Sequence, residues 1–83
     1  MKKVIIYGSD LCPDCINCKA DLDKAGVAYE YRSITDHLPY MKEFLAIRDR
    51  EQVFDGPREA GSIGIPCLVG EDGTVSLSWE QYL

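Results

Sequence analysis

The fold is predicted chiefly by the segment Lys3-Val4-Ile5-Ile6-Tyr7-Gly8-Ser9-Asp10-Leu11-Cys12-Pro13-Asp14-Cys15. Its β-branched and aromatic residues predict a buried strand over residues 2–8, which ends in a Gly-Ser-Asp loop. A helix is predicted over residues 13–25, because Gly26 follows and helices commonly end at such a glycine. Cys12 therefore stands at the mouth of a helix, where unpaired backbone N–H groups and the helix dipole favour a thiolate.

Two residues separate Cys12 from Cys15, and Cys18 follows one helical turn later. Such a pair can close a small disulfide ring or share a metal ion. Pro13 fits the first helical turn, where its missing N–H costs nothing. In a cytoplasmic chain, a strand followed by CxxC and a helix is typical of a thioredoxin-like redox motif. We therefore expect Cys12 to be the nucleophile and Cys15 the resolving thiol.

The size and charge of the chain limit the number of domains and the classes of partner that we expect. Its 83 residues predict one domain over 1–83, and a net charge of −5 argues against nucleic acid as a partner. No apolar run is long enough for a signal peptide or a membrane span, so we expect a cytoplasmic, monomeric protein without membrane contact. In that compartment the four cysteines are expected to be catalytic or metal-binding rather than structural.

The remaining chain alternates strands and helices in the order β-α-β-α-β-β. Residues 26–32 alternate apolar and polar side chains, and a strand–helix–strand unit of this length implies two parallel strands. Asp72-Gly73 predicts a turn that makes the last two strands an antiparallel hairpin. The later elements are predicted as a helix over 39–50, a short helix over 55–61 capped by Asp55, strands over 65–69 and 74–77, and a last helical turn opened by a capping box at 78–81.

Helical spacing predicts which side chains each helix buries. On the first helix the shared face carries Cys15, Cys18, Leu22 and Ala25. For the second helix, the helical spacing of Leu38, Met41, Phe44, Leu45 and Arg48 is the signal that predicts the helix itself. The mixed charges of residues 48–51 predict a solvated end of that helix.

Cys12-Pro13-Asp14-Cys15, followed by Cys18-Lys19 and later by Gly64-Ile65-Pro66, resembles the glutaredoxin family, and in particular small bacterial glutaredoxin-related proteins. The resemblance implies an α/β thioredoxin-like fold, with a four-stranded mixed sheet flanked by helices and a short C-terminal helical turn. It implies a thiol–disulfide oxidoreductase that reduces protein or glutathione-mixed disulfides and needs no metal. It also implies that Pro66 is cis, and that Pro13, Asp14, Ile65 and Pro66 contact the substrate.

Three features depart from the family pattern. No lysine stands shortly before Cys12, Asp14 replaces an aromatic residue inside the motif, and residues 78–80 replace a glycine pair that grips glutathione. We therefore expect weak glutathione binding. Trp79 after the last strand is similar to redoxins that draw electrons from thioredoxin reductase, so the reductant is either such a reductase or glutathione.

Alternatives remain for residues outside the CxxC pair. Cys18 fits the buried stripe as a small hydrophobe. The alternative function is a zinc or iron–sulfur carrier that binds its metal through four thiolates. Those four would be Cys12, Cys15, Cys18 and Cys67. His37 is expected to cap a helix or lie on the surface, and Trp79 to anchor the core.

Overall fold

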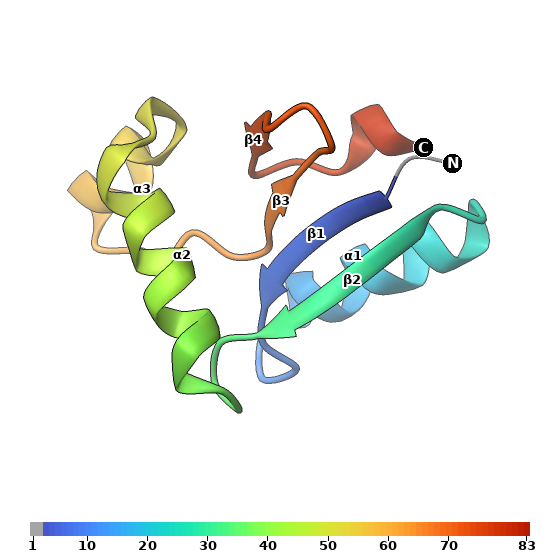
Figure 1. Ribbon diagram of the computed structural model, residues 1–83, viewed down its shortest axis with the longest axis horizontal. Helices are drawn as coiled ribbons and strands as arrows, with labels where there is room; N and C mark the ends of the chain where they lie inside the picture. Colours follow the sequence, from blue (N-terminus) through green and yellow to red (C-terminus); the bar gives the residue numbers. More distant parts are fainter. Residues whose placement is uncertain (1–2) are drawn as a thin grey trace.

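The structure is a computed structural model that describes residues 3–83 (Figure 1). Strands and helices alternate along the first part of the chain, and two short strands follow. The elements are β1 (Lys3–Gly8), α1 (Pro13–Lys24), β2 (Ala28–Ser33), α2 (Leu38–Arg50), the 3₁₀ turn η1 (Gln52–Phe54), α3 (Asp55–Ala60), β3 (Cys67–Val69), β4 (Val75–Ser76) and the 3₁₀ turn η2 (Glu80–Tyr82).

The four strands form one mixed sheet in the order β2-β1-β3-β4. β1 and β2 are parallel, with Ile6 opposite Tyr31, whereas β1 pairs antiparallel with β3, with Tyr7 opposite Cys67. β3 and β4 form the expected antiparallel hairpin. The fold is therefore the α/β, thioredoxin-like arrangement that the sequence predicted, with β1 between the parallel and the antiparallel halves.

Each face of the sheet has its own core, because side chains alternate between faces along a strand. α1 lies behind the sheet in Figure 1, and α2 lies on the other side together with α3. The core toward α1 is formed by Val4, Ile6, Cys18, Leu22 and Leu68. The core toward α2 is formed by Tyr7, Ile34, Phe44, Ile47, Phe54 and Cys67.

The helices bury fewer residues than their spacing predicted. α1 buries Cys15, Cys18 and Leu22 as expected, but Ala25 is exposed because α1 has already ended at Lys24. On α2, Leu38 and Leu45 are exposed by 69% and 41%, although they share the helical spacing that predicted the helix. Leu38 lies at the start of the helix beyond the edge of the core. The buried face is instead carried by Phe44 and Ile47.

Two predicted helix caps differ from the structure. Asp55 is the first residue of α3 rather than its cap, because η1 runs directly into the helix. The capping box over residues 78–81 does not form: Glu80 N–H approaches Ser78 Oγ at 3.4 Å, but Gln81 Oε1 accepts from Ser76 Oγ at 3.3 Å. The chain therefore makes only a 3₁₀ turn here.

The turn before β3 is set by Gly64. Its φ of +88° is one that side-chain-bearing residues rarely adopt, and a Cβ there would lie 2.6 Å from the Phe54 ring. Ile65 and Pro66 follow, joined by a cis peptide bond, and strand pairing starts only at Cys67. The strand predicted over residues 65–69 is thus shorter. No helix within residues 3–83 has the length and apolar character needed to cross a membrane.

Candidate redox site

The loop between β1 and α1 is held by Ser9, which sequence reasoning passed over as part of a turn. Ser9 is only 2% exposed. Its carbonyl accepts a hydrogen bond from Cys12 N–H at 3.0 Å, and its hydroxyl accepts one from Leu11 N–H at 3.1 Å. The same hydroxyl lies 2.9 Å from Thr35 Oγ1, beyond the end of β2. Ser9 therefore fixes the loop that presents Cys12; the only sequence signal was its position directly after the strand.

Cys12 occupies the N-cap of α1, as the sequence predicted. Its backbone is extended, and its carbonyl accepts hydrogen bonds from the N–H groups of Cys15 and Ile16 at 3.1 and 3.2 Å. The Cys12 side chain is half-buried, whereas Pro13 and Asp14 in the next two positions are exposed. The first turn of the helix thus places one accessible sulfur next to unpaired backbone N–H groups.

Cys15 lies one turn along α1 and is fully buried. Gly8 makes room for it, since a Cβ on that glycine would lie only 2.9 Å from Cys15 Sγ. Burial raises the pKa of the Cys15 thiol to about 12; a hydrogen bond from the Ser9 backbone opposes this shift, and the neighbouring Cys12 adds to it. The two cysteines of the motif therefore differ in access and in environment.

The charges around the motif include one compensation that the sequence did not reveal. Asp10, which precedes the motif, forms an ion pair with Lys19 Nζ at 2.7 Å. The pKa of Asp10 is lowered chiefly by this lysine. Lys19, from the second turn of α1, thus compensates the negative charge that Asp10 places near the start of the helix.

A groove of about 420 Å³ opens beside Cys12. Its walls come from the β1–α1 loop, the residues after β2, α2, and the segment that follows α3. Its lining residues are Ser9, Leu11, Cys12, Ile34, Thr35, Met41, Phe44, Leu45, Arg48, Gly61, Ser62, Ile63 and Ile65. Cys12 and Ile65 thus line one groove, while Pro13 and Asp14 lie outside it and Pro66 is buried behind Ile65.

Arg48 organises the far wall of this groove. Its Nε donates to the Ile63 carbonyl at 3.0 Å, and its Nη2 donates to the Ser62 carbonyl at 2.7 Å. The charge pattern around Arg48 predicted a solvated helix end. Asp49 and Arg50 are indeed exposed, but the half-buried Arg48 side chain also ties α2 to the segment leading into the cis Ile65–Pro66 bond. Only its place on the helical spacing with Phe44 could have indicated this role.

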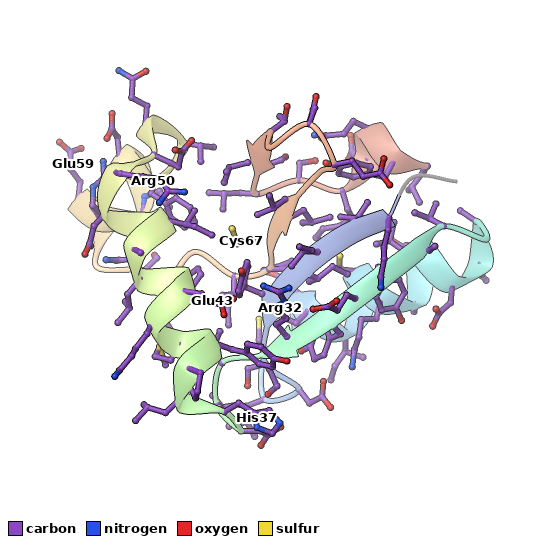
Figure 2. The ribbon with its side chains drawn as sticks, in the orientation of Figure 1. Arg32, His37, Glu43, Arg50, Glu59 and Cys67 are labelled. Atoms are coloured by element: carbon purple, nitrogen blue, oxygen red, sulfur yellow. The ribbon has the colours of Figure 1, made fainter. Side chains whose placement is uncertain are left out.

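The other two cysteines are buried on opposite faces of the sheet. Cys18 packs toward α1, and Cys67 packs toward α2, where Figure 2 shows its sulfur beside that helix. Burial raises the pKa of Cys18 to about 11 and that of Cys67 to about 12. Within residues 3–83, no three Cys, His, Asp or Glu side chains are grouped to hold a metal ion. The alternative four-thiolate site is therefore not assembled among these residues, because the sheet separates Cys18 from Cys67.

His37 and Trp79 take structural places. His37 is the N-cap residue of α2 but makes no side-chain capping bond (Figure 2). Its exposed ring meets the Tyr40 ring edge-on, with 5.5 Å between the two ring centres. Trp79 packs on the core toward α1, and its indole N–H donates to Asp21 at 2.9 Å.

A polar cluster away from Cys12 joins β1, β2 and α2, where Arg32 donates to Glu43 at 2.7 Å (Figure 2). It lies on the side of the sheet away from α1.

A cysteine at the mouth of α1, with a cis proline entering the antiparallel half of the sheet, places the protein in the thioredoxin-like class. The sequence also matches the model of the family described as Glutaredoxin, over residues 4–69. The chain therefore belongs to the glutaredoxin family. An uncharacterized protein of Haemophilus influenzae is 38% identical over 77 residues, which cover 93% of this chain and 90% of that protein. The comparison with solved structures gives no significant match.

Proposed function

We propose that the protein is a thiol–disulfide oxidoreductase that uses Cys12 as nucleophile and Cys15 as resolving thiol. The observation that carries this proposal is the contrast within one helical turn. The Cys12 side chain is half-buried and lines the groove, whereas Cys15 is fully buried behind it. A substrate disulfide can therefore reach Cys12 Sγ, whereas Cys15 Sγ can be reached only by Cys12 Sγ.

The cycle then has two exchange steps. The Cys12 thiolate attacks one sulfur of the substrate disulfide, forms a mixed disulfide, and releases the other substrate sulfur as a thiolate that takes a proton from water. Cys15 loses its proton to water and attacks Cys12 Sγ. The Cys12–Cys15 disulfide forms, the bond to the substrate breaks, and two electrons have passed to the substrate. A glutathione-type or thioredoxin-reductase-type reductant returns the site to the dithiol.

The groove favours a protein segment over glutathione as substrate. Its lining is mostly apolar, with Leu11 and Ile63 exposed by 85% and 57%. Glutathione carries two carboxylates, and among the lining residues only Arg48 is a cation. That guanidinium already donates to two backbone carbonyls. An apolar side chain next to a substrate cysteine fits these walls better than a charged tripeptide does.

Ile65 supports the same substrate class. It lies in the groove wall just before β3, where strand pairing begins at Cys67. An extended chain can align its backbone with such a segment and so hold its disulfide above Cys12. We therefore assign Ile65, with Pro66 fixing its orientation, to substrate binding, and we keep the exposed Pro13 and Asp14 as rim contacts. We further propose that the protein acts in the cytoplasm, where cysteines more often serve redox chemistry than structural disulfides.

A reductase-coupled assay tests the proposal. NADPH consumption is followed with insulin as a protein disulfide, and the electron source is either glutathione with glutathione reductase or thioredoxin reductase. We expect turnover of the protein disulfide that is lost in Cys12→Ser and kept in Cys18→Ser. We also expect low activity on a glutathione-mixed disulfide. No protein-disulfide reduction with either electron source would contradict the proposed function, and robust glutathione-dependent turnover would contradict the substrate class.

A further inference from the structure

The hydroxyl oxygen of Tyr31 is a buried polar atom without a hydrogen-bond partner among residues 3–83. Tyr31 belongs to β2, and its ring packs on the core between the sheet and α1. Buried hydroxyl groups almost always find a partner, because leaving one unpaired costs free energy. A phenylalanine would fill the same core without that cost, so the hydroxyl calls for an explanation.

The Tyr31 hydroxyl lies beside the resolving cysteine. The Cys15 sulfur and the Tyr31 hydroxyl both border the space that a side chain at Gly8 would occupy. A Cβ on Gly8 would lie 2.9 Å from Cys15 Sγ and 3.2 Å from the Tyr31 hydroxyl oxygen. The sulfur and the oxygen are therefore no more than about 6 Å apart. The glycine that makes room for Cys15 also opens the space between Cys15 and Tyr31.

In the described part of the chain, Asp10 is the one carboxylate that interacts with the Tyr31 hydroxyl, and Lys19 pairs with that carboxylate. Lys19 Nζ lies 4.0 Å from the centre of the Tyr31 ring and forms the 2.7 Å ion pair with Asp10. Burial, followed by the negative charge that Cys15 carries as a thiolate, raises the pKa of Tyr31. The phenol therefore remains protonated and is a donor at neutral pH.

We propose that Tyr31 is the hydrogen-bond donor that stabilises the Cys15 thiolate while Cys15 resolves the mixed disulfide on Cys12. This inference rests on the proposed function. In the step, Cys15 gives its proton to water and its sulfur forms the bond to Cys12 Sγ. The bond between Cys12 and the substrate breaks, and the substrate thiolate takes a proton from water. Tyr31 keeps its own proton and shares it with the Cys15 sulfur.

The charged and titratable groups that face the hydroxyl come from two elements. The β1–α1 loop contributes Asp10 and Cys12, and α1 contributes Cys15 and Lys19. Asp10 is the competing acceptor, since its carboxylate lies near enough to the Tyr31 hydroxyl for that hydroxyl to lower its pKa, after Lys19. Because Lys19 already pairs with this carboxylate, a thiolate formed on Cys15 is the stronger hydrogen-bond acceptor for the Tyr31 hydroxyl.

Tyr31→Phe tests the proposal, with Tyr29→Phe as the matched control two residues earlier on the same strand. Stopped-flow kinetics with a fluorescent protein disulfide separate the two steps, because a Cys15→Ser background isolates the attack by Cys12. For Tyr31→Phe we expect an unchanged first step and a second step slower by about tenfold or more, as for the loss of a hydrogen bond to a charged group. The pH profile of the second step should move to higher pH. Tyr29→Phe should change neither step.

A purely structural role for Tyr31 predicts something else. Loss of packing would lower the midpoint of urea unfolding, whereas removal of an unpaired buried hydroxyl should leave that midpoint unchanged or raise it. If Tyr31→Phe resolves the mixed disulfide at the wild-type rate with an unshifted pH profile, the inference is wrong and the two-cysteine cycle stands. If the wild-type protein forms no mixed disulfide at all, the proposed function fails as well.

Discussion

The N-cap cysteine of α1 and the two cysteines within the helix show how position on a helix sets chemistry. Cys12 is half-buried at the N-cap, and Cys15 and Cys18 are fully buried at three-residue intervals. Burial raises the pKa of the latter two, so both remain thiols near neutral pH. Motif spacing alone could predict this division, because the helical period fixes which residue faces the core. It could not predict Ser9 or Tyr31, whose roles depend on contacts between segments distant in the sequence.

The cysteine assignments predict three different outcomes of substitution. Cys12→Ser should abolish exchange with any disulfide. Cys15→Ser should block resolution, so that a substrate adduct accumulates on Cys12 and is visible by mass spectrometry. Cys18→Ser should leave the exchange rate nearly intact and lower stability by about 1–3 kcal/mol, because a hydroxyl replaces a buried thiol. An inactive but folded Cys18→Ser variant would show that a third thiol takes part.

At the scale of elements, the segment from Gly61 to Ile65 connects α3 to β3 and forms one wall of the groove. Two features hold it: the fit of Gly64 against the Phe54 ring, and the hydrogen bonds from Arg48 to the carbonyls of Ser62 and Ile63. The sequence predicted that a proline would enter the third strand. It could not predict the arginine that supports this proline, because carbonyl acceptors leave no signal in side-chain composition.

Arg48→Met should loosen this wall while keeping the aliphatic stem. Two hydrogen bonds are lost, and at about 1 kcal/mol each the free energy of unfolding should fall by about 1–2 kcal/mol. The KM for a protein disulfide should rise more than kcat falls, since the change touches binding rather than the sulfurs. Arg50→Met, on the exposed side of the same helix, is the control and should change neither quantity. Equal effects of the two substitutions on KM would exclude a specific role for Arg48.

Across the whole molecule, the order of elements and the mixed sheet could be predicted because each strand and helix carries its own periodicity. The lengths of β3 and β4 could not, since they depend on the turn at Gly64 and on pairing with β1. The face of the sheet on which the Cys67 side chain lies could not be predicted either, because it depends on the sheet register. Its pairing with Tyr7 sends its side chain toward α2, away from Cys18, and this removes the four-thiolate site.

Stability should depend on pH through the three buried thiols. Burial raises the pKa of Cys15, Cys18 and Cys67 to about 12, 11 and 12, from an ordinary value of 9.0. The unfolded chain therefore loses these protons near pH 9 while the folded chain keeps them. The free energy of unfolding should be constant below about pH 8 and fall as the pH rises above 9.

Urea unfolding under reducing conditions at pH 7, 8, 9 and 10 measures this dependence. Cys67→Ala is the matched control, because it removes one buried thiol outside the CxxC pair and should make the decline less steep. A free energy of unfolding that stays level or rises between pH 9 and 10 would contradict the assignment of buried, protonated thiols.

Disulfide mapping after one round of substrate reduction shows directly whether Cys12 and Cys15 form the product disulfide. Reduced Cys18→Ser protein is mixed with excess insulin, quenched with acid, alkylated, and digested with a protease that cleaves before aspartate. Asp10 and Asp14 then place Cys12 and Cys15 on separate peptides. The two-cysteine cycle predicts a loss of 2 Da and a bridge between these two peptides, with Cys67 alkylated. A bridge to Cys67, or intact protein with no disulfide while insulin is reduced, would contradict it.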